Sequence, residues 1–74
     1  MFDGTRFAKR LEAMRQNAGL TRSQLADRAY LTRQSVWNYE RGLRTPDCSV
    51  LYALCEVLNC SADALLGRED WSVK

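Results

Sequence analysis

The sequence predicts an all-α fold of five helices in one domain, and three observations support this prediction. The chain has 74 residues, which is enough for one small domain and too few for two. Apolar residues recur at helical spacing in several segments. No segment shows the alternating pattern of a strand or an Asn-Gly hairpin signal. We expect the domain to cover residues 1–67, followed by a short tail over residues 68–74.

The first helix is expected to start between residues 3 and 5 and to run to residue 18. Its apolar stripe consists of Phe7, Leu11, Met14 and Ala18. Gly19 follows this stripe and is typical of a helix C-terminus. The first element is therefore an amphipathic helix with one face toward the core.

The second and third helices are expected over residues 22–29 and 33–41. Thr21 and Gln24 have the spacing of a capping box, in which each side chain bonds an otherwise free backbone amide. Thr32 is placed to cap the third helix, and Gly42 to end it. The residues of the second helix expected to face inward are Leu25, Ala26 and Ala29.

Asp47 follows the only proline and is placed to cap a fourth helix that ends at Asn59. Ser61 is placed to cap a fifth helix, which runs to residue 66 and stops at Gly67. Apolar residues cover more than one face of the fourth helix, so we expect it to be the most buried element. These residues are Val50, Leu51, Leu54, Cys55, Val57 and Leu58.

Charge is unevenly distributed along the chain. Residues 1–45 carry a net charge of +5 and residues 46–74 one of −3, within a total of +2. This favours a polyanionic partner on one side. The chain has neither an apolar run long enough for a membrane helix nor an N-terminal secretory pattern. An odd number of cysteines does not suit a disulfide framework, so we expect a cytoplasmic protein without membrane contact.

The third helix separates into two faces at 100° per residue. Its inner side holds Ser35, Val36, Tyr39 and Glu40, and the opposite arc of about 140° also includes Arg41. Arginine can pair with guanine, Gln or Asn with adenine, and an apolar ring can touch the thymine methyl group in the major groove. The residues predicted to contact base edges, here called the outer face, are Arg33, Gln34, Trp37 and Asn38.

Phosphate contacts are predicted around this helix. Arg22 begins the second helix beside free amides and the positive end of the helix dipole, which suits phosphate binding. A phosphate-binding helix, a tight turn and an exposed helix together match helix-turn-helix docking on double-stranded DNA. The predicted phosphate contacts are Arg22, Thr32, Ser35, Arg41 and Arg44.

Other classes of function lack their characteristic residues. The chain has no histidine, glycine-rich phosphate loop or paired carboxylates, so we expect no enzyme, no catalytic residue and no cofactor. Cys48, Cys55 and Cys60 lack a Cys-x-x-Cys pair, so we expect buried thiols of the fourth helix and no metal site. The remaining alternative is a protein-interaction module, such as an antitoxin or regulatory subunit, that uses Trp37 and Tyr30.

The chain resembles the phage repressor and Cro helix-turn-helix family from about residue 7 to residue 67. The similarity rests on Gly-Leu-Thr-Arg-Ser-Gln-Leu-Ala at residues 19–26, Leu-Thr-Arg-Gln-Ser-Val at residues 31–36 and Tyr-Glu-Arg-Gly at residues 39–42. It implies a compact, five-helix, lambda-repressor-like domain in which helices 2 and 3 form the helix-turn-helix. It further implies a transcriptional regulator, commonly a repressor on a near-palindromic operator, and a pairing of Arg15 with Glu40. The resemblance places the outer face at base edges and Arg22, Ser35 and Arg44 at the DNA backbone.

Two residues depart from the family pattern. Tyr30 stands in the turn where the family commonly has glycine, and a left-handed backbone there would cost a bulky residue about 1–2 kcal/mol. Trp37 stands where many relatives are polar, so the operator preference of a relative does not transfer.

We also expect a homodimer, because two recognition helices about 34 Å apart would span successive major grooves. The expected dimer contacts are Leu65, Leu66 and Trp71.

Overall fold

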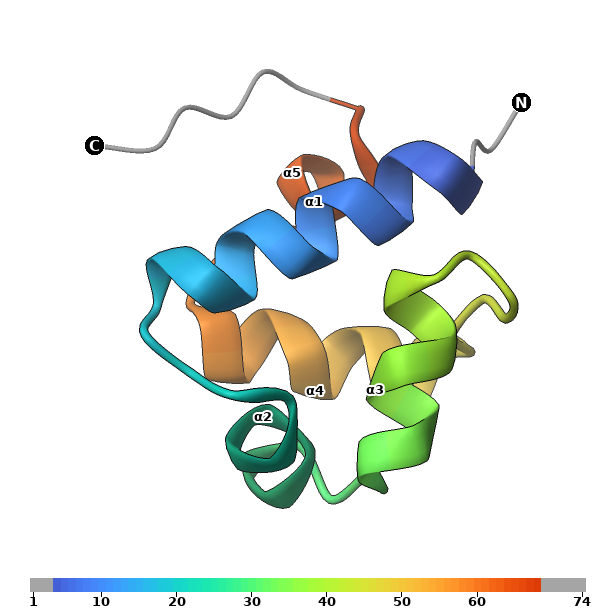
Figure 1. The fold of residues 1–74 in the computed structure, drawn as a ribbon. Coiled ribbons are helices and arrows are strands. Elements are labelled where there is room, and N and C mark those ends of the chain that lie inside the picture. Colours follow the sequence, from blue (N-terminus) through green and yellow to red (C-terminus); the bar gives the residue numbers. More distant parts are fainter. Residues whose placement is uncertain (1–3, 69–74) are drawn as a thin grey trace.

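The computed structural model of the protein describes residues 4–68 and contains five helices in this range (Figure 1). They are α1 (Gly4–Asn17), α2 (Arg22–Arg28), α3 (Arg33–Glu40), α4 (Cys48–Leu58) and α5 (Ala62–Leu66). No strand occurs in the described part, and the all-α prediction is confirmed. The first three helices end one residue earlier than expected, and in α2 and α3 the last expected residue is the C-cap. Across residues 4–68, no helix combines the length and apolar character that a membrane crossing requires.

The predicted residues cap the N-termini of α2 to α5. Thr21 accepts the Gln24 backbone N–H at 3.1 Å, and the Gln24 side chain accepts the Thr21 N–H at 2.8 Å, which completes the capping box. Thr32, Asp47 and Ser61 each accept the backbone N–H three residues ahead, at 3.0, 2.9 and 3.0 Å. Each cap satisfies one of the amides that a helix start leaves free, and so sets where the helix begins.

The helices pack around one hydrophobic core. α1 contacts α3 and α5, α2 packs against α3, and α4 contacts α2 and α5 (Figure 1). The largest fully buried side chains come from all five helices and are Phe7, Leu11, Leu25, Val36, Leu54 and Leu65. The inward orientation predicted for Leu25, Ala26 and Ala29 is confirmed.

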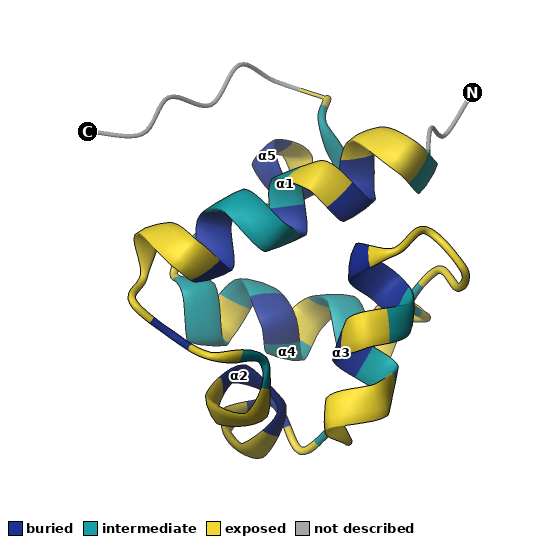
Figure 2. Cartoon of the chain, in the orientation of Figure 1, coloured by how far each residue is buried: buried dark blue, intermediate teal, exposed yellow. Residues whose placement is uncertain are grey.

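The prediction that α4 is the most buried helix is wrong. Leu54 is the only residue of α4 that is buried, and Tyr52 is 70% exposed. Figure 2 shows α4 mostly at intermediate burial, whereas α1 presents several buried positions to the core. The physical reason is that the apolar residues cover more than one face of α4, so most of them pack against the edge of the core and stay only partly buried.

Of the three residues expected at a dimer interface, one is buried in the core and one lies outside the described range. Leu65 is fully buried in the core of the monomer, so it is not available to the homodimer contact expected of it. Leu66 is half-buried, and Trp71 lies outside the described residues.

The expectation of three buried thiols is also wrong, because Cys48 is exposed and Cys60 is half-buried just beyond α4.

The turn between α2 and α3 contains a left-handed tyrosine. Tyr30 has a φ of 59°, and its side chain is 95% exposed. The Leu31 N–H donates to the Ala26 carbonyl at 2.8 Å and closes the end of α2 around this residue. The turn therefore keeps the left-handed geometry that favours glycine, although a bulky residue occupies it.

Candidate nucleic-acid interface

α3 is anchored through one face and exposes the other. Val36 is fully buried and Tyr39 is 5% exposed, so these side chains hold the helix against the core. On the outer face, Arg33 and Gln34 are exposed, and Trp37 is 38% exposed (Figure 2). Asn38, the fourth member of that face, is half-buried. The two-sided pattern calculated from the sequence is thus present in the structure.

Contacts along the helix order the side chains of the outer face. The Gln34 amide Nε2 donates to the Asn38 side-chain Oδ1 at 3.1 Å, one helical turn further on. The guanidinium carbon of Arg41 lies 5.4 Å from the centre of the Trp37 ring, within the range of a cation–π contact. Arg33, Gln34 and Trp37 together line a shallow hollow. A ligand at this face would meet hydrogen-bonding groups beside an aromatic surface.

The predicted phosphate contacts surround the ends of α3. Thr32 caps α3, and its hydroxyl donates to the Ser35 Oγ at 2.9 Å, so its proton is already engaged. Ser35 is half-buried, and its own hydroxyl can still donate. Arg41 and Arg44 are exposed at and beyond the C-terminal end of α3. Donors therefore lie at both ends of the outer face, where a duplex backbone would pass if the helix entered a groove.

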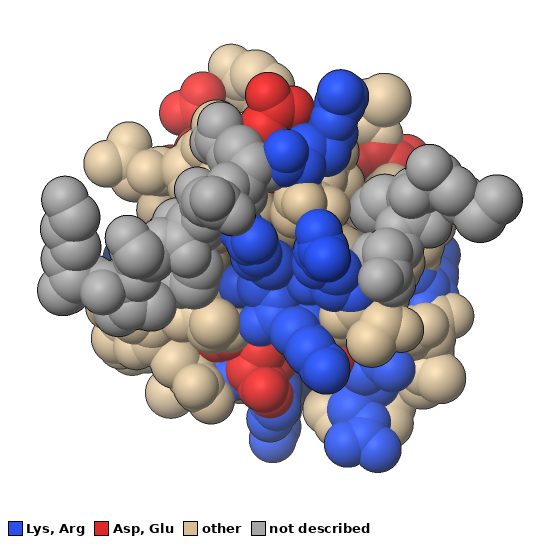
Figure 3. Space-filling view, turned by 90° about the horizontal axis from the view of Figure 1, so that it is seen from above, with Lys and Arg blue, Asp and Glu red and all other residues tan. Residues whose placement is uncertain are grey.

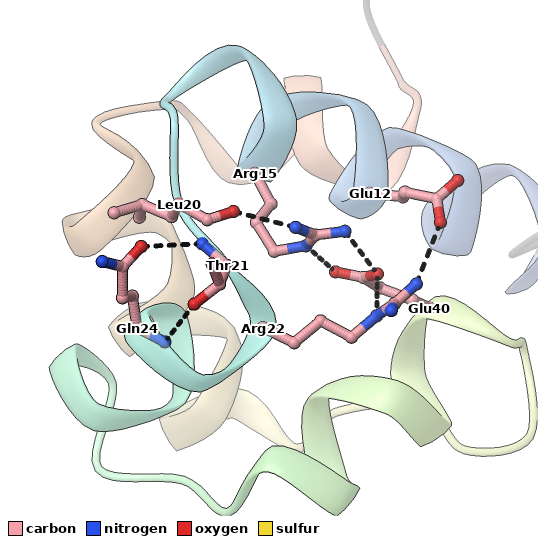
Figure 4. Close-up of polar contacts among 7 residues, drawn as sticks. All are labelled: Glu12, Arg15, Leu20, Thr21, Arg22, Gln24 and Glu40. Atoms are coloured by element: carbon pink, nitrogen blue, oxygen red, sulfur yellow. Dashed lines mark hydrogen bonds and ion pairs between the residues drawn. The ribbon is translucent and has the colours of Figure 1, made fainter.

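A buried ion pair fixes the C-terminal end of α3 to α1. Glu40 has a fully buried side chain and accepts from Arg15 through two bonds, at 2.6 Å from Nε and 3.2 Å from Nη2 (Figure 4). Arg15 is itself buried and also donates to the Leu20 carbonyl at 2.8 Å. The pairing of Arg15 with Glu40 implied by the family resemblance is thus observed.

Arg22 belongs to the same network, which the sequence reasoning missed. Its Nε donates to the Glu40 Oε1 at 2.9 Å, and its Nη2 lies 3.3 Å from the Glu12 carboxylate (Figure 4). About a third of the Arg22 side chain stays exposed, at 33%. Arg22 therefore neutralises a buried carboxylate as well as standing at the start of α2. Its partners come from two other helices, so no local sequence signal indicates them.

Basic side chains also gather on α1. Arg6 and Lys9 are exposed and Arg10 is half-buried, and Figure 3, which looks down on the α1 side, shows a group of Lys and Arg side chains across this face. Arg6 donates to the Gly67 carbonyl and Arg10 to the Ala64 carbonyl, both at 3.1 Å. These bonds join α1 to the C-terminal end of α5. Part of the positive charge of the first half of the chain thus has a structural role.

Comparison with known proteins agrees with this geometry. Residues 6–66 match the family of helix-turn-helix domains. The HTH-type transcriptional regulator ImmR of Bacillus subtilis is 39% identical over 66 residues, which are 89% of this chain and 52% of ImmR. The uncharacterized HTH-type transcriptional regulator YqaE of the same organism is 35% identical over 63 residues, 85% of this chain and 54% of YqaE. The chain thus spans about half the length of these relatives.

Two solved structures share both the fold and recognisable sequence identity. The restriction-modification controller protein C.AhdI from Aeromonas hydrophila superposes with a TM-score of 0.81 at 30% identity, covering 85% of this chain and 96% of that one. The P22 c2 repressor in complex with a synthetic operator gives a TM-score of 0.81 at 25% identity, with the same coverage of 85% and 96%. The chain belongs to the helix-turn-helix domain family of the phage repressor and Cro type, as these matches, the anchored α3 and the capped helices show.

Proposed function

We propose that this chain is a sequence-specific, double-stranded DNA-binding domain that acts in transcription regulation by inserting α3 into the major groove. The observation that carries the proposal is the exposed outer face of a short helix that Val36 and Tyr39 hold from behind. An α-helix fits the major groove, and arginine and amide side chains match the hydrogen-bonding edges of guanine and adenine there. The c2 repressor, which shares this fold, is bound to a synthetic operator.

Within this proposal, the residues divide into base contacts and backbone contacts. The outer face supplies the base contacts, and Arg33 and Gln34 are its exposed hydrogen-bonding members. Arg41, Arg44 and Ser35 supply donors to phosphate, and Thr32 holds the Ser35 Oγ in place through its own hydroxyl. Arg22 joins these donors through the third of its side chain that remains exposed. Phosphate contacts fix the position of α3, and base contacts give the preference for one sequence. We propose repression as the outcome, since a bound domain occludes the duplex.

We also propose that two copies bind a near-palindromic operator together. The domain measures 27 × 27 × 19 Å along its principal axes, whereas successive major grooves on one side of a duplex are about 34 Å apart. One copy therefore covers one half-site. Leu66, which is half-buried at the end of α5, is the remaining described member of the contact proposed from the sequence. Sedimentation that shows a monomer at high micromolar concentration, with and without DNA, would refute this dimer.

Selection of binding sites from a random DNA pool tests the DNA-binding proposal. We expect enrichment of a motif with two-fold symmetry, and binding that weakens steeply with added salt because phosphate contacts release counterions. A protein-interaction module would enrich no motif, and its partner binding would depend little on salt. The absence of any enriched sequence would contradict the proposal.

Substitutions separate the two kinds of contact. Arg44→Ala should weaken binding to all sequences alike and lower the salt slope by about one unit. Arg33→Ala should cost about 1–3 kcal/mol on the selected site and relax the preference at one base pair. If Arg33→Ala weakened all sequences alike, the assignment of Arg33 to a base edge would be wrong.

A further inference from the structure

The three cysteines of the chain border one hollow, which is separate from the outer face of α3. The hollow has a volume of about 540 Å³ and lies along α4 and the turn to α5. Cys48, Cys55 and Cys60 all line it, together with Leu51 and Tyr52. Cys48 is exposed, while Cys55 and Cys60 are half-buried and open to the hollow. Small reagents can therefore reach all three thiols in the folded domain.

The turn that ends α4 places two of these thiols side by side. Asn59 adopts a left-handed conformation with φ 53° and ψ 50°. The Cys60 N–H donates to the Cys55 carbonyl at 3.1 Å, and the Asn59 N–H donates to the Glu56 carbonyl at 3.4 Å. This pair of bonds defines a Schellman motif, which brings the two residues of its outer bond into side-chain contact. Accordingly, the Cys55 and Cys60 thiols are hydrogen-bonded to each other.

We propose that Cys55 and Cys60 form a reversible dithiol modification site, which a low-molecular-weight disulfide of the glutathione class converts into an intramolecular disulfide. The thiolate of one cysteine attacks the small disulfide, forms a mixed disulfide and expels one small thiolate. The second cysteine then attacks the protein sulfur of the mixed disulfide and expels the other small thiolate. The two protons of the protein thiols pass to the two released thiolates. The protein is oxidised by two electrons, and the small disulfide is reduced to two thiols.

The backbone is already arranged for this bond. Cross-linking requires the two α-carbons to lie within the narrow range that disulfide geometry allows. The 3.1 Å backbone bond from Cys60 to Cys55 holds the two residues together before any oxidation. Cys48 stands apart from this pair, because it begins α4, about two helical turns before Cys55. We therefore expect Cys48 to react independently as a single thiol.

The protonation of the pair sets the rate and the persistence of the reaction. Burial raises the pKa of Cys60 to about 12, with the Cys55 thiol beside it as a further cause. Burial also raises the pKa of Cys55. Few thiolates are present at neutral pH, so the disulfide forms slowly. For the same reason the reduced form gains little stability from ionisation, so the disulfide resists reduction once formed.

The experiment uses the full chain and three matched variants, Cys48→Ser, Cys55→Ser and Cys60→Ser. Each folded protein is incubated with excess oxidised glutathione, quenched with iodoacetamide and weighed intact by mass spectrometry. We expect the Cys48→Ser chain to lose two hydrogen atoms and to retain neither glutathione nor a carbamidomethyl group. Cleavage after Glu56 should then yield two peptides joined through Cys55 and Cys60. The other two variants should instead retain glutathione as mixed disulfides.

Two outcomes would overturn the proposal. Stable glutathione adducts without an internal disulfide in the Cys48→Ser chain would show that the pair does not close. Loss of two hydrogen atoms by the Cys60→Ser chain would show that Cys48 and Cys55 pair instead. Thermal unfolding gives an independent check, because a cross-link that fits the native turn should raise the Tm of the Cys48→Ser chain by several degrees. An unchanged or lower Tm would contradict the claim that the backbone is already arranged for this bond. None of these measurements depends on DNA binding, so they test this proposal separately from the proposed function.

Discussion

Replacing Tyr30 by glycine should stabilise the domain, although it removes an aromatic side chain. Tyr30 has a φ of 59°, a conformation that costs an L-residue about 1–2 kcal/mol. Glycine removes this cost but adds about 0.4–1 kcal/mol of unfolded-chain entropy. The ring is 95% exposed, so its loss sacrifices little buried surface. We expect a net gain of about 0.5–1 kcal/mol in the free energy of unfolding, or about 2–8 °C in Tm.

Tyr30→Ala is the matched control for this substitution. It also removes the exposed ring, but it keeps a β-carbon and therefore keeps the strained backbone. We expect it to unfold within about 0.5 kcal/mol of the unmodified chain. Urea unfolding followed by far-UV circular dichroism would measure all three proteins. A Tyr30→Gly domain no more stable than Tyr30→Ala would refute the argument that the turn is strained.

Three further substitutions and one titration follow from the structure. Glu40→Gln leaves the buried Arg15 without an anionic partner and leaves Arg22 with only Glu12, so urea unfolding should show a loss of about 3–5 kcal/mol. A loss below about 1 kcal/mol would contradict the buried network. Gly67→Ala should lower the Tm more than Gly19→Ala does. Both glycines have a positive φ, but only at Gly67 would the added β-carbon collide with another side chain, that of Arg6. Equal effects would contradict that contact. The rate of Cys60 alkylation by iodoacetamide should rise about tenfold per pH unit, and this rise should continue well above pH 9.0, the ordinary pKa of a thiol, because burial keeps the thiol protonated. Peptide mass spectrometry would measure the rate. A rate that levels off near pH 9.0 would contradict the prediction.

The features predicted well from the sequence depend on residues close together in the chain. Capping by Thr21, Thr32, Asp47 and Ser61 needs only a backbone amide within one turn, so the side chain and its spacing suffice to locate it. The two faces of α3 follow from helical periodicity in the same way. Local patterns therefore predicted where the helices begin and which side of α3 is exposed.

The features that the sequence could not supply depend on contacts between distant elements. Apolar residues cover several faces of α4, and only the packing of the other helices decides that Leu54 is the buried one. Arg22 finds its partners on α1 and α3, and Arg10 reaches a carbonyl of α5 across 54 positions of the chain. Leu65 was expected at a dimer interface because the sequence does not show which helices pack over it. Long-range packing thus accounts for each of these corrections.

The central claim is that the outer face of α3 reads the base sequence of DNA. It is tested most directly by substituting one glutamine on that face and one elsewhere, and by measuring the affinity of each variant for altered binding sites. Gln34 lies on that face, whereas Gln16 is an exposed glutamine on α1. The affinities of Gln34→Ala, Gln16→Ala and the unmodified chain would be measured on the selected site and on each of its single base-pair variants. We expect Gln34→Ala to abolish a preference of about 1–3 kcal/mol at one position of each half-site, and Gln16→Ala to leave every preference unchanged. An unchanged base preference in Gln34→Ala, with affinity reduced or not, would contradict the account.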